Sequence, residues 1–203
     1  MNDITFRVLE KFPEPAYTAL VAQAFSDYEE SELLAEVARE ETAARSRAHA
    51  VANDDERALR IGAFRGDTLV GWTYACPEGG SLLYMINSGV APAERQRGIY
   101  SELARLVIEH ARSNGYAAIL SRHAANNNAV IIAKLKLGFL VSGFEYSEVY
   151  GPLVRLTMLL GNLRRQLYRA RSTPIRRAMP KNESSVPGRV STGTAKASRR
   201  PRE

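Results

Sequence analysis

The sequence predicts an α/β (α+β) sandwich of strands and helices, followed by a basic C-terminal tail. Short apolar runs typical of strands occur between longer stretches whose apolar residues have helical spacing. The 203 residues, 45% of them hydrophobic, suit one domain of ordinary size with an additional segment. After Gly161, large apolar residues become rare and arginines accumulate. We therefore expect a globular domain over residues 1–161 and a tail over residues 162–203.

The first third of the chain predicts a strand, two helices and a hairpin. Residues 4–9 alternate in part between apolar and polar, as in a short strand. From Pro15 to about Phe25 the apolar residues fall on one helical face, and proline suits a first helical turn. Residues 33–51 are rich in Ala, Glu and Arg and predict a second helix. Strands follow at residues 58–64 and 69–75, joined by a tight turn.

The middle of the chain alternates strands and helices. An apolar strand over residues 82–90 precedes an amphipathic helix, which Asn114 and Gly115 end. A short buried strand is expected at residues 117–120, and the next helix is capped by residues 126–128 and ends at Gly138. Residues 139–145 and 153–160 predict the last two strands.

Charge is divided unevenly along the chain. The whole sequence has a formal net charge of +6, but residues 162–203 carry ten arginines and two lysines against two glutamates. The remainder is mildly acidic. Residues 163–171 predict a basic helix, and residues 172–203 have too few large apolar side chains to offset the entropy of ordering. Such a tail could bind nucleic acid or an acidic surface by releasing counterions, without reading sequence.

Other features narrow the class of protein. No apolar run approaches the ~20 residues of a membrane span, and the N-terminus lacks a signal-peptide core. The single cysteine, Cys76, is expected to be a small strand hydrophobe, and the default location is cytoplasmic. The three histidines lack ligand spacing, so no metal site is predicted.

A basic turn between the strand at residues 82–90 and the following helix is suited to phosphate. The backbone N–H groups of residues 96–101 would lack intrahelical partners and carry the positive end of the helix dipole. Arg95 and Arg97 add charge, and Gly98 lets an anion approach the backbone closely. The sequence therefore predicts an anion site at this turn.

Residues 95–100 read Arg-Gln-Arg-Gly-Ile-Tyr and resemble the signature of the GNAT superfamily of N-acyltransferases, Gln/Arg-x-x-Gly-x-Gly/Ala before a helix. Val90 and Pro92 match the usual hydrophobic residue and proline upstream. The chain departs from the signature at Tyr100, where Gly or Ala is usual. The resemblance implies a GNAT-like mixed central sheet flanked by helices.

A second block, residues 127–139, is similar to the family's Asn-x-x-Ala-x-x-x-Tyr-x-Lys-x-Gly-Phe segment. Asn127, Lys136, Gly138 and Phe139 align with it, whereas Lys134 replaces the tyrosine. Together with the residues between them, the two blocks cover about a quarter of the chain.

The resemblance implies an N-acetyltransferase that transfers an acetyl or other acyl group from acetyl-CoA to a primary amine of a small molecule or protein. In that fold two neighbouring parallel strands separate, and the pantetheine arm pairs with the first of them. The residues implied at the donor site are Ser88, Gly89 and Val90 for the arm, Arg95, Gln96, Arg97, Gly98, Ile99, Tyr100 and Ser101 for the pyrophosphate, and Asn127 from the other side.

Candidate catalytic residues follow from the direct attack of an amine on a thioester. An ammonium of pKa ~10.4 is neutral only about once in 2,500 molecules at pH 7, so deprotonation matters more than protonation of the thiolate. Lys134 could stabilise charge on sulfur, or it could be a solvated helix residue. The polar candidates for the base are Tyr84, Asn87 and Ser88 on the strand and His123 after residues 117–120, with a water chain or a purely structural role as alternatives.

Alternatives to this function remain open. Because Lys134 replaces the tyrosine and residues 82–90 contain no carboxylate, the chain could be a non-catalytic acyl-CoA-binding regulatory module with a nucleic-acid-binding tail. The acceptor and the oligomeric state are open. A cluster of acidic residues could attract a cationic amine, or it could be a solvated helix face. Its members are Asp27, Glu29, Glu30, Glu32, Glu36, Glu40 and Glu41.

Overall fold

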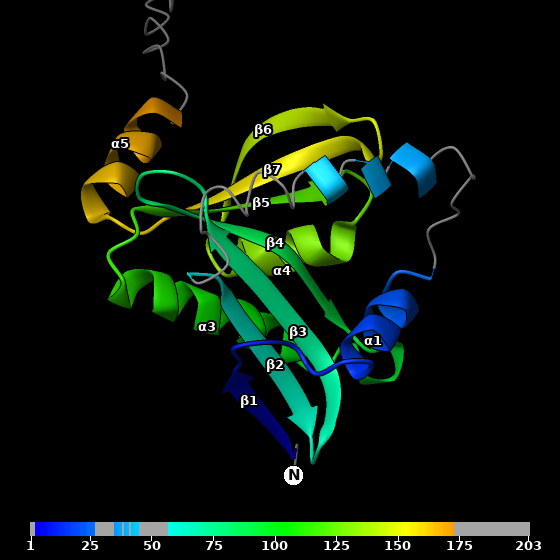
Figure 1. Cartoon of the computed structure of the whole chain (residues 1–203). Coiled ribbons are helices and arrows are strands. Elements are labelled where there is room, and N and C mark those ends of the chain that lie inside the picture. The colour runs from blue at the N-terminus through cyan, green and yellow to red at the C-terminus, as the bar shows by residue number, and fades with distance from the viewer. Residues whose placement is uncertain (1–2, 27–34, 38, 41, 45–56, 173–203) are drawn as a thin grey trace, which may run out of the picture.

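The computed structural model describes residues 3–26, 35–37, 39–40, 42–44 and 57–172. They form one seven-stranded sheet with helices on both faces (Figure 1). The elements are β1 (Ile4–Val8), α1 (Ala16–Ala24), β2 (Leu59–Arg65), β3 (Thr68–Pro77), β4 (Leu82–Val90), a 3-10 turn (Pro92–Glu94), α3 (Ile99–Ser113), β5 (Ala118–Ala124), α4 (Asn128–Lys136), β6 (Leu140–Ser147), β7 (Gly151–Leu159) and α5 (Asn162–Ser172).

The sheet is mixed, with the strand order β1-β2-β3-β4-β5-β7-β6. Only β4 and β5 run parallel, joined by the helical connection through α3, whereas every other neighbouring pair is antiparallel. The hairpin between β2 and β3 turns at Gly66, whose φ of 57° lies in the left-handed region that glycine adopts at no steric cost. The predicted sandwich of a central sheet and flanking helices is confirmed.

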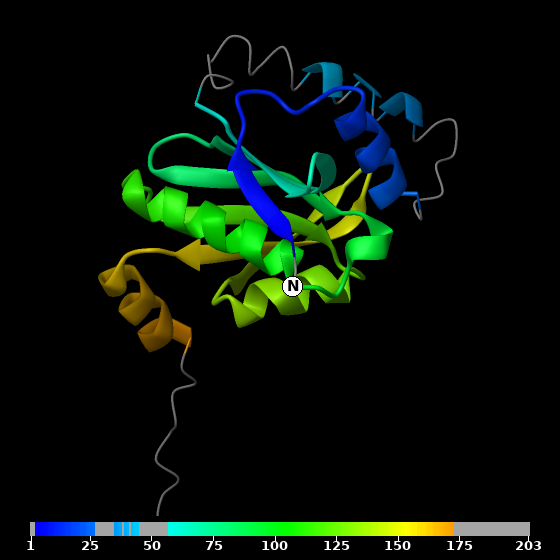
Figure 2. The same cartoon turned by 90° about the horizontal axis from the view of Figure 1, so that it is seen from below.

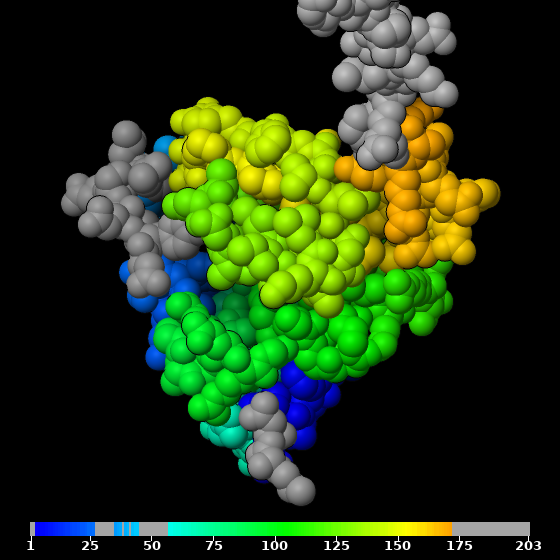
Figure 3. Space-filling view, turned by 180° about the vertical axis from the view of Figure 1, so that it is seen from behind, coloured from blue at the N-terminus to red at the C-terminus, as the bar shows by residue number. Residues whose placement is uncertain are grey.

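The main hydrophobic core lies between the sheet and α3. Six apolar residues of α3 are buried at helical spacing, and they pack against β2, β3, β4 and β5. They are Ile99, Leu103, Ala104, Val107, Ile108 and Ala111. Helix α4 lies on the same face, and α5 lies beside them, as Figures 2 and 3 show.

A second, smaller core lies on the opposite face, beneath α1. Trp72 of β3 is completely buried there and packs against Leu20 of α1. Its ring also makes edge-on contacts with Tyr17 and Phe25, at centroid distances of 5.7 and 6.0 Å. This cluster fixes α1 over the middle of β3 and β4, where the site described below begins.

The pairing between β4 and β5 ends halfway along the two strands. Four residue pairs join them, from Leu82 with Ala118 to Met85 with Ser121. Beyond that point β4 continues to Val90 beside β3, and β5 continues to Ala124 beside β7. Because Ile86 is bulged out of the register with β3, β4 also bends at the same place. The strands therefore form a fork whose base is at Met85 and Ser121.

Several predicted elements differ from the structure in their bounds. The strand expected at residues 117–120 extends to Ala124, because its second half pairs with β7 alone. The helix expected at residues 33–51 is helical where it is described, at residues 35–37, 39–40 and 42–44, and its ends lie outside the described residues. The predicted basic helix is confirmed as α5. The tail expected to be disordered lies outside the described residues from 173 onward, and the domain boundary at Gly161 stays a prediction.

No helix in the described ranges is long and apolar enough to cross a bilayer. Cys76 is buried in β3, as predicted for a strand residue.

Candidate active site

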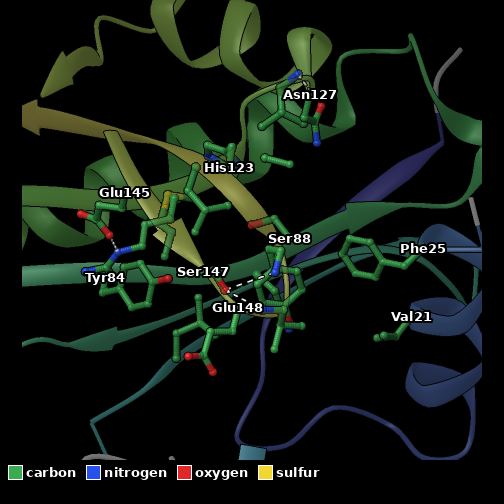
Figure 4. Close-up of a pocket in the computed structure, with 18 of the residues that line it drawn as sticks. Val21, Phe25, Tyr84, Ser88, His123, Asn127, Glu145, Ser147 and Glu148 are labelled. Atoms are coloured by element: carbon green, nitrogen blue, oxygen red, sulfur yellow. Dashed lines mark hydrogen bonds and ion pairs between the residues drawn. The ribbon is translucent and has the colours of Figure 1, made fainter. Parts of the chain in front are cut away.

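A cavity of about 1350 Å³ opens at the fork between β4 and β5. Its walls come from α1, β4, β5, α4, the hairpin of β6 and β7, and the helical residues Val37, Glu40 and Ala44. Figure 4 shows the cavity with Ser88 near the middle of the view, Val21 and Phe25 of α1 to one side, and Tyr84 and Glu145 to the other. Strands far apart in the sequence therefore contribute side chains to one space.

Lys134 is the most unusual residue of the cavity wall. It lies on α4 near the base of the fork and is only 1% exposed. Its ammonium nitrogen lies 3.0 Å from Met85 Sδ and 4.6 Å from the centre of the Phe139 ring, neither of which is a strong acceptor. Burial lowers the pKa of Lys134 to about 7. The alternative that Lys134 is a solvated helix residue is therefore wrong.

His123 lies inside β5, opposite Val154 of β7, because this strand extends beyond the expected residues 117–120. Its Nε2 atom is 3.1 Å from Ser121 Oγ at the base of the fork. Burial, and to a smaller extent the charge of Lys134, lower its pKa to about 3. The imidazole is therefore neutral at pH 7 and a much weaker base than an exposed histidine.

Tyr84 belongs to a polar network at the other side of the cavity. The Arg122 guanidinium lies over the Tyr84 ring, 4.8 Å from its centre, and donates from Nε to Glu145 Oε2 at 2.7 Å. Arg155 Nη1 approaches the other carboxylate oxygen of Glu145 at 3.2 Å. The network holds β5, β6 and β7 together beside β4, so the Tyr84 ring is fixed in position.

Ser88 and Asn87 connect the free part of β4 to β3. Ser88 Oγ is 2.7 Å from the hydroxyl of Thr73, which is completely buried. Asn87 Oδ1 accepts a hydrogen bond of 2.8 Å from Trp72 Nε1. These contacts on the β3 side hold β4 in place where β5 no longer supports it.

The predicted anion turn lies where β4 leads into α3. Gly98 precedes the helix with a φ of 80°, and Gln96 also has a left-handed φ of 63°. The first intrahelical bond of α3 is donated by Glu102, so the amide groups before it remain available at the positive end of the helix. Such a turn is an anion-binding concavity.

The two arginines of this turn behave differently. Arg95 donates to the carbonyl of Ala24 at 2.9 Å, and so connects the turn to the end of α1. The side chain of Arg97 is 49% exposed and pairs at 3.3 Å with Glu94, which Arg65 also binds at 2.7 Å. Arg97 is therefore the arginine that can reach an incoming anion without breaking a contact to α1.

Tyr100 and Asn127 line the same cavity from the two helices behind the fork. The Tyr100 hydroxyl is buried and has no hydrogen-bond partner among the described residues, and burial raises its pKa. Asn127 directly precedes α4, and its Oδ1 atom accepts from the backbone N–H of Val130 at 3.3 Å. Asn127 is thus the cap that the sequence predicts.

The structure brings some of the predicted site residues into the cavity and leaves others outside. Those in its wall are Tyr84, Ser88, Tyr100, His123, Asn127 and Lys134. The others follow the edge of β4 and the turn beyond it, namely Gly89, Val90, Arg95, Gln96, Arg97, Gly98, Ile99 and Ser101. Ile99 is buried in the core, so only its backbone can contact a ligand.

Several cavity residues were missed by sequence reasoning. Arg122 of β5, Glu145 of β6 and Glu148 of the turn between β6 and β7 line the cavity, and their proximity depends on the strand order β5-β7-β6. Of the acidic group between residues 27 and 41, Glu40 lines the cavity and Glu36 is exposed; the others lie outside the described residues. In the described part of the chain, no three metal-ligating side chains lie together.

The sheet is forked between two parallel strands, and the open edge of the first strand leads to an anion-binding turn. The chain belongs to the acetyltransferase (GNAT) family, whose model matches residues 17–139. A comparison with curated proteins found no match.

Solved structures with the same fold include several acetyltransferases. The ribosomal-protein-S18-alanine N-acetyltransferase of Escherichia coli has a TM-score of 0.59 at 18% identity, covering 78% of this chain and 94% of its own. A probable acetyltransferase of Staphylococcus epidermidis has a TM-score of 0.59 at 18% identity, covering 78% and 99%. An acetyltransferase of Bacillus subtilis in complex with CoA has a TM-score of 0.56 at 16% identity, covering 78% and 99%.

Family membership confirms the predicted class. The chain is an acyltransferase of the N-acetyltransferase type, and acetyl-CoA is its donor.

Proposed function

We propose that this chain transfers an acetyl group from acetyl-CoA to a primary amine, with the reaction taking place at the base of the fork between β4 and β5. The observation that carries the proposal is the position of Lys134, which is buried in the cavity wall beside Met85 at the point where the two strands separate. A buried lysine that pairs with no carboxylate among the described residues is costly to fold, so a role in chemistry is a reason for its presence.

The donor is proposed to lie along the free edge of β4. Residues 86–90 have no pairing with β5, so their backbone can form hydrogen bonds with the amides of the pantetheine arm. The arm would lead from the turn at residues 95–98, where Arg97 and the amides of α3 hold the pyrophosphate, to the fork base. Ser88 and Asn127 then lie on either side of the arm, and the thioester comes close to Lys134.

Lys134 is proposed to move the proton of the reaction. Near pH 7 it populates both its neutral and its charged form, because burial lowers its pKa to about 7. The neutral amine can accept the proton that the incoming ammonium must lose, and the charged form can return a proton to the leaving thiolate of pKa ~8.5. His123, neutral at pH 7, is assigned a positioning role through Ser121.

The acceptor is proposed to enter between α1 and the hairpin of β6 and β7. Phe25 and Tyr150 line this side of the cavity, together with the carboxylates of Glu40 and Glu148. Carboxylates at an entrance favour a cationic acceptor such as an ammonium, which must arrive before it loses its proton.

The experiment that tests the proposal has two readouts on the full chain. Acetyl-CoA should raise the melting temperature, and amines from a broad panel should increase the release of free CoA thiol. Lys134→Met should preserve the melting shift and lower kcat, whereas Lys136→Met should change neither. A melting shift without thiol release from any amine would favour the non-catalytic acyl-CoA-binding module, and no melting shift would reject both functions.

We also propose that the basic segment after Gly161 binds nucleic acid or another polyanion, and that the chain is cytoplasmic. The net charge of +10 over residues 162–203 supports the first proposal. The lone buried Cys76, which needs no oxidising compartment, supports the second. Cell fractionation tests the location.

A further inference from the structure

We propose that Lys134 is a site of self-acetylation, at which the buried amine takes the acetyl group of bound acetyl-CoA when no acceptor amine occupies the cavity. This inference rests on the proposed function, because it requires the thioester to lie at the base of the fork. It adds a covalent state of the chain that the transfer reaction does not require.

The position of the amine carries the inference. Lys134 lines the cavity, and its Nζ lies 3.0 Å from the Sδ atom of Met85, which belongs to the last residue pair before β4 and β5 separate. In the described part of the chain it has no ion-pair partner, since the cavity carboxylate Glu145 is held by Arg122 and Arg155. A thioether is a weak acceptor and holds the amine only loosely. The nitrogen is therefore free to turn toward a thioester in the same space.

The state of the amine favours attack. Burial lowers the pKa of Lys134 to about 7, so about half of the molecules carry a neutral amine at pH 7, against about one in 2,500 for an exposed lysine. The nearby His123 is neutral and adds no charge. Lys136, two residues further along the chain, is exposed and does not line the cavity.

The step is an ordinary acyl transfer. The lone pair of Lys134 Nζ attacks the thioester carbonyl, a C–N bond forms and the C–S bond breaks. The proton lost by nitrogen goes to sulfur, so the products are an acetyl-lysine and the free CoA thiol. No further reactant is needed.

The product would switch the enzyme off. An amide is far less reactive than a thioester, so the acetyl group stays on Lys134 and is not passed on. The acetylated side chain has no basic nitrogen, and it occupies the space of the thioester. The chain would therefore inactivate itself when acetyl-CoA is abundant and the acceptor is scarce.

The test is to incubate the full chain with acetyl-CoA alone and to map acetylation by mass spectrometry. Cleavage after glutamate releases residues 110–145, which contain Lys134 and Lys136 and no other lysine, so the two compete within one peptide. We expect an acetyl group on Lys134 in most molecules and only traces on Lys136. Lys134→Arg should abolish the modification of this peptide, whereas Lys136→Arg should leave it unchanged.

Two controls make the outcome decisive. The same chain unfolded in denaturant should lose the preference for Lys134, because the preference comes from the folded cavity. A saturating acceptor amine should protect Lys134. If Lys134 stays unmodified, or if both lysines react equally in the folded chain, the inference is wrong. Amine-dependent thiol release measured on the same sample reports the proposed function separately, so the two failures are distinguishable.

Discussion

The ammonium nitrogen of Lys134 lies 3.0 Å from the Sδ atom of Met85, and this contact joins α4 to β4 at the last residue pair before β5 separates. A charged group paired with a thioether is poorly compensated in a buried site. The contact therefore costs stability in a place where a methionine or leucine would pack at no such cost. What the lysine provides in return is a titratable nitrogen beside the open strand edge.

Lys134→Met should stabilise the chain in a pH-dependent way. The pKa of Lys134 falls from about 10.5 in the unfolded chain to about 7 in the folded one, so folding releases a proton between these values. The stability of the wild type should rise as the pH increases from 7 toward 10.5, and the penalty is fully present below pH 7. The advantage of the variant, at most about 5 kcal/mol, should be largest below pH 7 and shrink above it.

Urea unfolding at a series of pH values measures this difference in the free energy of unfolding. Lys136→Met serves as the control, because Lys136 is exposed on the same helix and carries no burial penalty. If the difference in the free energy of unfolding between Lys134→Met and the wild type stayed constant over the whole pH range, the burial argument would be wrong.

Arg97→Ala should weaken the binding of acetyl-CoA about tenfold, because one charge-assisted contact to phosphate is worth about 1.5 kcal/mol. We expect the variant to keep the fold, since Arg97 is half exposed and Glu94 retains its ion pair with Arg65. Isothermal titration with acetyl-CoA measures the change. Arg112→Ala removes an exposed arginine from the other end of α3 and should bind normally. If both variants bound acetyl-CoA as tightly as the wild type, the assignment of the pyrophosphate to this turn would be wrong.

Gly89→Ala should destabilise the chain by about 1 to 3 kcal/mol, because an added Cβ would lie 2.3 Å from Trp72 Cη2. Trp72 is fully buried between α1 and the sheet, so β4 must shift or the indole must turn. Since β4 carries the open edge, the affinity for acetyl-CoA should fall as well. Gly161→Ala is the matched control, whose Cβ meets only Arg164 at 4.0 Å. Thermal unfolding with and without acetyl-CoA measures both effects.

The basic segment should give the chain a salt-dependent affinity for a DNA duplex. Ending the chain at Ser172 removes six arginines and two lysines, and ending it at Gly161 also removes the four arginines of α5. The slope of log affinity against log salt should therefore fall in two steps. Fluorescence anisotropy at several salt concentrations measures the slopes. If both shortened chains bound as tightly as the full chain, the proposal for this segment would be rejected.

Elements with a strong local pattern were predictable from the sequence. Helix α3 has apolar residues at helical spacing and Gly98 before its first turn, and the anion turn follows from the same residues. Asn127 was predictable as a cap for the same kind of reason. In each case the interactions that decide the structure lie within a few residues of chain.

Other parts depend on contacts between distant strands. The second half of β5 contains Arg122 and His123 and looks like a loop, because these side chains face a cavity that only the fork creates. Helix α4 is apolar nearly all round, with Ile132 and Leu135 exposed, so its sequence does not predict that Lys134 is the buried residue. The approach of Glu145 to Tyr84 through Arg122 needs the strand order itself.

The fork has a consequence for the stability of the whole molecule. Only four residue pairs join the four strands on one side of it to the three strands on the other. A ligand that bonds to the open edge of β4 and touches Asn127 behind β5 would brace these two halves against each other. Since a ligand that binds only the folded form adds to its stability, the lifetime of this chain would depend on the supply of acetyl-CoA around it.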